Sequence, residues 1–189
     1  MTSALFEVLG DEEFCVTAVR GLDEAEVLSR LGAGAGPVPC YPMEDVIAQV
    51  HPETEAARIY APRDGDWAFL LDVIGSEGWS QSAPVLARLC RGTEAVSVCK
   101  VLDFTTKVVL ARDGAVVARF DVWLDQRPSG PRADDLARIL SLPAEGKPEE
   151  LFSPGAVLEA VEKEFGLRRV DPAALTGPLP TITASALNS

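Results

Sequence analysis

The sequence has little of what enzymes and metalloproteins most often use. Its 189 residues include one histidine, His51, and a Ser-His-Asp or Cys-His arrangement would have to use it. His51 precedes Pro52 in a polar segment, where the usual explanation is the end of a helix. Four cysteines, at positions 15, 40, 90 and 99, show no C-x-x-C spacing that would indicate zinc binding or redox chemistry. We therefore expect no catalytic residue, metal or cofactor, and favour a protein that is not an enzyme.

Long apolar runs and an export signal are also lacking. No stretch approaches the roughly 18 apolar residues that a membrane span needs. The opening MTSALFEVLGDEE has acids where a signal peptide would have basic residues followed by an apolar run. We therefore expect a cytoplasmic protein without a membrane partner, in which the cysteines are buried thiols rather than disulfides.

Positive charge is scarce as well. The formal net charge is −12 and the isoelectric point is near 4.5. Binding to a nucleic-acid backbone needs a basic surface that neutralises phosphates, so we expect no nucleic-acid partner. The acidity allows a basic protein partner without requiring one.

Two glycine-rich segments fail the tests for known chemistry. The stretch GAGAG at 32–36 follows an expected helix and opens no helix carrying a lysine, so it is neither a P-loop nor a dinucleotide fingerprint. Ser76 has a glycine directly before it, whereas a nucleophile elbow needs glycines two residues away on either side. Both segments are therefore interpreted as turns or linkers.

The patterns that are present predict an α+β fold. Strands are expected at about 14–20, 57–61, 66–74, 94–102, 105–112 and 115–123, and helices at about 21–33, 43–50, 82–92, 133–142 and 153–166. Because hairpins join most of the strands, we expect an antiparallel sheet of about five or six strands with helices packed mainly on one face. We expect residues 1–170 to form a single domain and 171–189 an irregular C-terminal tail.

The clearest local signal is the Asp113-Gly114 pair between two alternating apolar runs, which predicts a two-residue hairpin. A second clear alternation places Trp67, Phe69 and Leu71 on one face of their strand. The cross-strand pairs expected for the hairpin are Arg112 with Ala115, Leu110 with Val117, and Val108 with Arg119.

The stretch EGWSQSAPVLARLCRGTEAVSVCKVLDFTTKVVLARDGAVVARFDV, at 77–122, resembles a family of uncharacterised actinobacterial proteins, with similarity over about residues 12–125. That family has a tryptophan-bearing strand, an E-x-x-G-[FW] turn, a P-x-V-L-x-x-L helix, an A-V-S-V strand and a D-G hairpin ending in F-[DE]. The matching residues are Trp67, Gly78 with Trp79, Pro84 to Gly92, Ala95 to Val98, Asp113-Gly114 and Phe120-Asp121. Cys90 stands where the family has serine, and the usual proline after Phe120-Asp121 is missing. The resemblance implies a bacterial domain of unknown function and supplies no catalytic residue.

Candidate binding residues are acids and tryptophans at strand ends. The candidate carboxylates are Asp72, Glu77, Asp103 and Asp121. If Asp72 and Asp121 face the side of the sheet away from the helices, they could line a polar groove and share an acidic site. Trp79 and Trp123 are large, rigid and amphipathic, as interface anchors often are, although burial under helices explains such residues equally well. The binding residues we predict are Asp72, Glu77, Trp79, Asp121 and Trp123.

Three functions are consistent with these observations. The first is a non-catalytic, acidic protein-interaction module, in the manner of an inhibitor, immunity protein or accessory factor. The second is a protein that binds a small ligand in a pocket between the sheet and the helices. The third is an enzyme whose carboxylates act without a metal or histidine. We favour the first.

Overall fold

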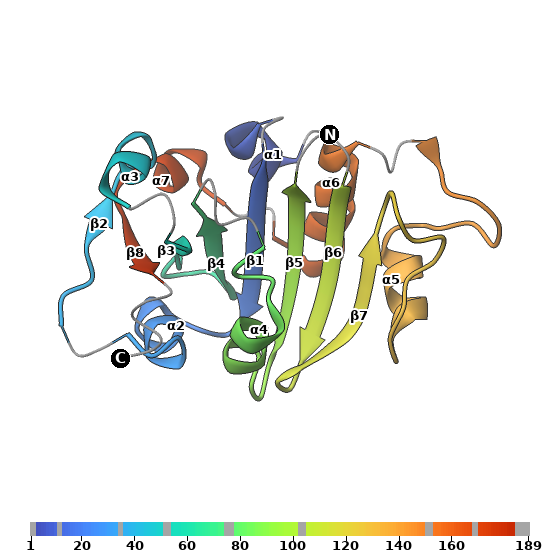
Figure 1. Ribbon diagram of the computed structural model, residues 1–189, viewed down its shortest axis with the longest axis horizontal. Coiled ribbons are helices and arrows are strands. Elements are labelled where there is room, and N and C mark those ends of the chain that lie inside the picture. Colours follow the sequence, from blue (N-terminus) through green and yellow to red (C-terminus); the bar gives the residue numbers. More distant parts are fainter. Residues whose placement is uncertain are drawn as a thin grey trace.

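The computed structural model describes residues 3–10, 13–33, 36–50, 54–73, 78–101, 105–149, 153–167 and 170–183. These residues form helices and one sheet (Figure 1). The helices are α1 (Ala4–Leu9), α2 (Glu24–Arg30), α3 (Met43–Gln49), α4 (Ala83–Leu89), α5 (Ala133–Ile139), α6 (Pro154–Phe165) and α7 (Pro172–Thr176). The strands are β1 (Phe14–Arg20), β2 (Cys40–Tyr41), β3 (Ala56–Tyr60), β4 (Trp67–Asp72), β5 (Glu94–Val101), β6 (Thr105–Arg112), β7 (Ala115–Asp121) and β8 (Leu179–Thr183).

The sheet is open and antiparallel, with the strand order β2-β8-β3-β4-β1-β5-β6-β7. The α+β class is confirmed, but the expected five or six strands are eight. The two missed strands are short and contain or adjoin proline, which weakens a strand pattern. In the segment 171–189, expected to be irregular, α7 forms and β8 inserts between β2 and β3.

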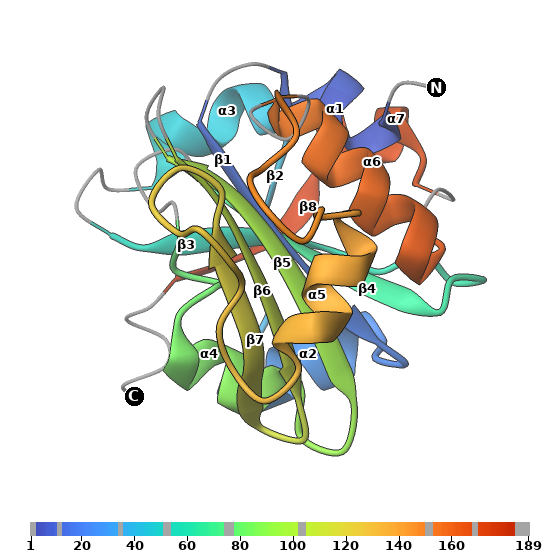
Figure 2. The ribbon, with the colours of Figure 1, turned by 90° about the vertical axis from the view of Figure 1, so that its right-hand side faces the viewer.

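Both faces of the sheet are covered, which corrects the expectation that helices pack mainly on one. One core joins the sheet to α1, α5, α6 and α7, and a second joins it to α2 and α4. Figures 1 and 2 show α4 and α6 on opposite sides of the strands. Trp67, Phe69 and Leu71 share the first core as expected, while Ala68 and Leu70 lie in the second. Alternation therefore identified the two faces correctly, but both are apolar.

The Asp113-Gly114 hairpin is confirmed, with φ values of 51° and 82° at the two turn residues. Its register differs from the expected one, because a β-bulge shifts the pairing between Leu110 and Ala111. Beyond the confirmed pair of Arg112 with Ala115, the observed pairs include Leu110 with Ala118 and Val108 with Phe120. The extra residue turns Phe120 into the core beneath α5 and α6, where it is 1% exposed.

The chain after β7 folds back over this outer strand of the sheet. The amide of Arg132 donates to the carbonyl of Val117 at 2.9 Å, and Ser129 forms a bridge with Arg119. Gly130 has a φ of 109°, and a Cβ there would lie 2.6 Å from the Val117 oxygen, so glycine is required. Residues 129–132 therefore cover the outer edge of the sheet. They also fix the position at which α5 begins.

A buried carboxylate ties the N-terminal helix to the body of the protein. Glu162 of α6 is 1% exposed, and its Oε1 accepts hydrogen bonds from Ser3 Oγ and the Leu5 amide, each at 2.9 Å. Ser3 is also the N-cap of α1. One carboxylate oxygen therefore fixes both the start of α1 and its docking on α6.

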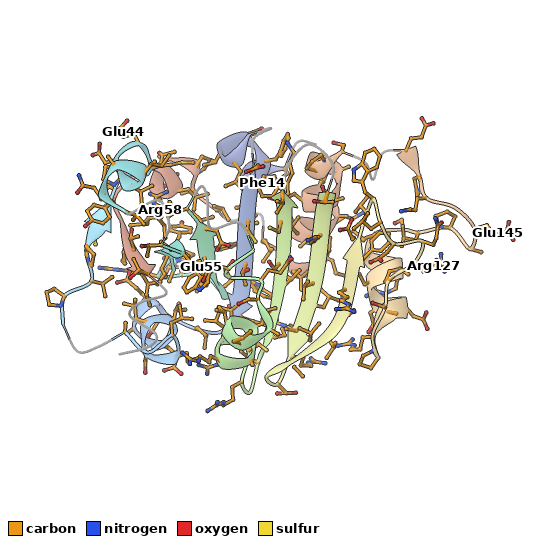
Figure 3. The ribbon with its side chains drawn as sticks, in the orientation of Figure 1. Phe14, Glu44, Glu55, Arg58, Arg127 and Glu145 are labelled. Carbon is orange, nitrogen blue, oxygen red and sulfur yellow. The ribbon has the colours of Figure 1, made fainter. Side chains whose placement is uncertain are left out.

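A buried guanidinium connects β3 to the C-terminal elements (Figure 3). Arg58 Nη2 donates to the carbonyl of Gly177, at the end of α7, at 2.6 Å. Burial lowers the pKa of Arg58 from its ordinary value. The hydrogen bond compensates part of that burial and helps to hold the segment that leads into β8.

We expect Glu162→Ala to lower the free energy of unfolding by about 1–3 kcal/mol, because it leaves two buried donors without an acceptor. Urea denaturation followed by circular dichroism measures this change. Lys163→Ala, at the adjacent exposed position of α6, is the control and should change stability by less than about 0.5 kcal/mol. Equal effects of the two substitutions would contradict the role of Glu162.

Candidate functional site

The structure does not bring the predicted binding residues together. Asp72 and Asp121 lie on β4 and β7, with β1, β5 and β6 between them. Four strand spacings separate them by about 19 Å, so they form no shared acidic site. Three positions considered in the sequence, Ser76, Glu77 and Asp103, lie outside the described residues, as does His51.

Asp72 organises the turn that follows β4. Its Oδ2 accepts hydrogen bonds from the amides of Gly78 and Ser80, both at 3.1 Å. Between these two residues, Trp79 enters the core beneath α2 and α4 and is 5% exposed. In this conformation Trp79 packs inside the protein and offers no surface to a partner.

A polar cluster lies beside Asp72 within the same core. Thr17 Oγ1 is 2.8 Å from both Ser80 Oγ and Ser97 Oγ. Burial, with a smaller contribution from Asp72, raises the pKa of the Cys15 thiol well above its ordinary value. A thiol in that state is a poor nucleophile. The cluster therefore satisfies buried polar groups and holds β1, β5 and the 78–80 turn together.

Burial also raises the pKa of Asp72 to about 7, against the opposing effect of the hydrogen bonds from Ser80 and Gly78. The folded protein thus holds this proton more tightly than the unfolded chain. Between about pH 4 and pH 7, the contribution of Asp72 to the free energy of unfolding falls by up to about 1.4 kcal/mol for each pH unit. Above about pH 7 this contribution is constant.

We expect the stability of Asp72→Asn, relative to the native protein, to increase as the pH is raised through that window, because asparagine does not ionise. Urea denaturation at several pH values between 4 and 8 measures the difference. Asp64→Asn, in the exposed turn before β4, is the matched control. If the difference in free energy of unfolding between the native protein and Asp72→Asn stayed constant with pH, the pKa of Asp72 would not be raised by folding.

The turn after β7, residues 121–125, is built around two carboxylates. Asp121 Oδ1 accepts from the amides of Trp123 at 3.0 Å and Leu124 at 3.1 Å. Asp125 Oδ2 accepts from the amide of Asp121 at 2.9 Å. We call this segment the β7 turn.

Lys147 holds the β7 turn from the other side. Its Nζ donates to the carbonyls of Val122 and Asp125 and lies 5.5 Å from the centroid of the Phe120 ring. Backbone donors and acceptors of the turn are therefore both engaged. The β7 turn is a fixed structure rather than a loose loop end.

This fixed turn presents apolar side chains to solvent. Trp123 is 48% exposed and Leu124 is 74% exposed. Among the large apolar side chains that are exposed in the described ranges, three belong to β7 or its turn, the third being Val116. The other is Ile47 on α3. The sequence analysis found Asp121 and Trp123 but missed Leu124, whose only signal is its place beside Trp123.

A groove of about 460 Å³ lies next to the β7 turn, on the face of the sheet that α4 covers. Its walls combine apolar and charged residues, including Ala83, Lys107, Val109, Val116, Arg119 and Asp121. Lys107 is opposite Asp121 in the strand register. The Oδ2 atom of Asp121 is buried and, among the described residues, has no hydrogen-bond partner. The groove thus lies between a buried carboxylate and exposed apolar surface.

Neither a metal centre nor a membrane span is found in the part of the chain that is described. No group of three or more His, Cys, Asp or Glu side chains in that part is placed to hold a metal ion. No helix there is both long enough and apolar enough to cross a bilayer.

One known protein family matches this chain. The model of a family of unknown function, DUF6461, matches residues 2–143, which include β1 to β7 and α1 to α5. The elements α6, α7 and β8 follow the matched region. Comparisons with curated proteins and with solved structures returned no match. Because the match covers most of the sequence, the chain belongs to the DUF6461 family of unknown function.

Proposed function

We propose that this protein is a non-catalytic interaction module that binds another protein through the β7 turn and the adjoining groove. The fixed presentation of Trp123 and Leu124 supports this proposal most strongly. The turn that carries them is held by backbone amides that donate to two carboxylates and by one ammonium group that donates to two backbone carbonyls.

A tryptophan held in this way is suited to be an interface anchor. Burying it against a partner removes a large apolar area from water, and tryptophan is enriched among residues that dominate binding energy. Because the turn is already ordered, association loses little backbone entropy. The groove beside it can receive a side chain of the partner.

The charge distribution favours a basic partner. A net charge of −12 attracts positive proteins over long distances and speeds their association. Asp121 and Asp125 line the groove, and their negative charge favours a lysine or arginine of the partner beside it. Lys107 and Arg119 nearby select against a partner segment that is basic throughout, so we expect a mixed apolar and basic segment.

The proposal extends to the organism and cellular compartment in which the protein acts. We propose a bacterial, cytoplasmic protein of actinobacterial type that acts as an inhibitor, immunity protein or accessory factor. The resemblance of residues 77–122 to a family of uncharacterised actinobacterial proteins supports this setting.

Trp123→Ala tests the proposal. Tagged native protein and variant are used to capture partners from an extract of the source organism, and captured proteins are quantified by mass spectrometry. We expect at least one basic protein to be retained by the native form and lost with the variant. For the purified pair, calorimetry should show binding weakened by about thirtyfold, the effect typical of a hot-spot tryptophan.

Ile47→Ala is the matched control, because Ile47 is a similarly exposed apolar residue, at 54%, on α3. It should retain the partner, and both variants should keep the native unfolding temperature. Raising the salt concentration should slow association. Recovery of the same proteins by native protein and Trp123→Ala would contradict the proposed surface.

A further inference from the structure

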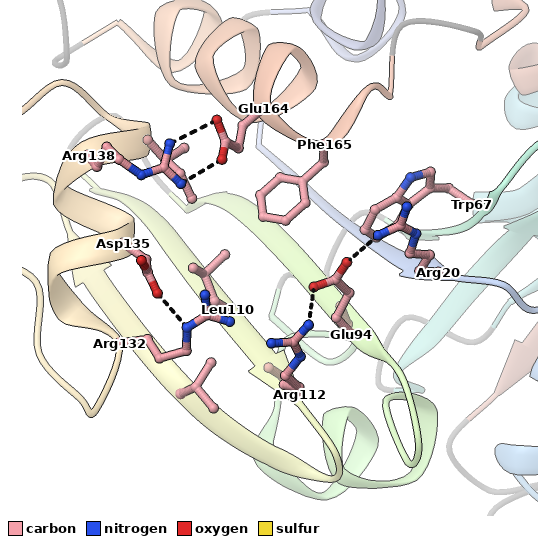
Figure 4. Close-up of a pocket in the computed structure, with 14 residues that line it drawn as sticks. Arg20, Trp67, Glu94, Leu110, Arg112, Arg132, Asp135, Arg138, Glu164 and Phe165 are labelled. Carbon is pink, nitrogen blue, oxygen red and sulfur yellow. Dashed lines mark hydrogen bonds and ion pairs between the residues drawn. The ribbon is translucent and has the colours of Figure 1, made fainter.

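A second hollow, of about 260 Å³, lies on the opposite face of the sheet from the groove beside α4. It is enclosed by α5, the C-terminal end of α6, the C-terminal ends of β1 and β6, and the N-terminal end of β5 (Figure 4). Strand ends and gaps between a sheet and its helices are common positions for ligand sites.

The walls of this hollow are positively charged within a strongly acidic protein. Four arginines face three carboxylates there, which leaves one excess positive charge, whereas the whole chain carries −12. The arginines are Arg20, Arg112, Arg132 and Arg138, and the carboxylates are Glu94, Asp135 and Glu164.

One arginine of this set, Arg138, forms a bidentate ion pair with a carboxylate. Arg138 donates to both oxygens of Glu164, at 2.7 and 3.2 Å, a bidentate pair that joins α5 to α6. This pairing lowers the pKa of Glu164 and raises that of Arg138. Arg138 therefore has a structural role at the rim.

Two other arginines share a single carboxylate. Arg20 donates to Glu94 at 2.8 Å, while Arg112 Nη2 is 3.6 Å from the other Glu94 oxygen, which is too long for a hydrogen bond. Arg20 and Arg112 together carry one more positive charge than Glu94 balances, so a bound anion near them would be stabilised electrostatically. In the described part of the chain, the guanidinium of Arg112 thus has donors available.

Arg132 provides the second set of available donors. Only its Nε is used, in the ion pair with Asp135, so in the ranges described both Nη groups remain for a ligand. Figure 4 shows Arg112 and Arg132 extending into the same hollow, from a strand end and from the start of α5. Paired guanidinium groups match the geometry of carboxylate and phosphate oxygens.

Part of the lining of the hollow is apolar. Leu110 and Ile139 are core residues that also line it. Phe165 is packed edge-on against Trp67, with ring centroids 5.6 Å apart. The volume is smaller than the range typical of drug-sized ligands. A bound molecule would therefore be small and would have an apolar part as well as an anionic group.

We propose that this hollow binds a small organic oxyanion, a carboxylate or phosphate group on an apolar body. Arg112 and Arg132 bind the oxyanion, and Leu110, Ile139 and Phe165 contact the apolar body. The site is independent of the β7 turn, so the protein has a ligand site in addition to its proposed interaction surface.

The proposal is tested with benzoate and phenyl phosphate as probes, at constant ionic strength, by titration of the labelled protein in NMR. We expect saturable shifts that include the indole N–H of Trp67. Arg112→Gln and Arg132→Gln should each weaken binding about tenfold or more, as expected for the loss of a charge-assisted hydrogen bond. The tighter of the two probes identifies the oxyanion as carboxylate or phosphate.

Three controls make the result specific. Arg91→Gln, at an exposed arginine after α4, removes the same charge elsewhere and should bind like the native protein. Benzyl alcohol and inorganic phosphate each lack one half of the proposed ligand and should bind much more weakly. The proposal is overturned if neither probe binds, if both arginine variants bind as well as the native protein, or if benzyl alcohol or inorganic phosphate binds as tightly as the probes.

Discussion

One β-bulge between β6 and β7 determines the arrangement of this side of the molecule. It adds a residue to β7 between the pairs Ala111 with Val116 and Leu110 with Ala118. As a result Phe120 points into the core, and Asp121 lies on the other face, opposite Lys107. The β7 turn begins at Asp121. Without the shift, Phe120 and Asp121 would exchange faces.

The same bulge positions the helix that forms one wall of the arginine-lined hollow. The carbonyl of Val117 accepts the amide of Arg132, and Gly130 is required because that carbonyl approaches so closely. The start of α5 is thereby fixed against β7. A local irregularity in one hairpin thus places both the groove on the α4 face and the hollow on the α5 face. Bulges frequently aim side chains at functional positions in this way.

Burial of the sheet on both faces explains why the candidate sites lie at its margins. The central strands are enclosed by the α1, α5, α6 and α7 core on one side and the α2 and α4 core on the other. Their polar residues, such as Thr17 and Ser97, bond to each other rather than to a ligand. Within the described ranges, the candidate sites therefore lie at strand ends, in the β7 turn and beside the helices.

The sequence predicted most elements whose signals are local. The Asp113-Gly114 turn, the alternation in β4 and the α6 helix ending at Gly166 were all identified, because turn conformation, alternation and caps depend on adjacent residues. β8 depends on pairing with strands that are distant in the sequence, so no local pattern revealed it. The bulge lies within the β6–β7 hairpin, but the register expected from a two-residue loop does not include it.

The candidate sites were predictable only in part. Asp121 and Trp123 were predicted as strand-end residues and lie in the β7 turn, and Asp72 accepts hydrogen bonds from the turn after β4. The arginines of the hollow were missed because three segments distant in the sequence, β1, β6 and α5 with its N-cap, contribute them. Arg20 before Gly21 and Arg112 before the D-G turn did mark strand ends, but their shared location needs the complete sheet order.

The register of β6 against β7 is the most direct test of this account. Cross-strand backbone NOEs in isotopically labelled protein report which residues face each other. The bulged register predicts contacts of Val108 with Phe120 and of Leu110 with Ala118. Contacts of Val108 with Arg119 and of Leu110 with Val117 would contradict it, since Asp121, the β7 turn and α5 would then lie elsewhere.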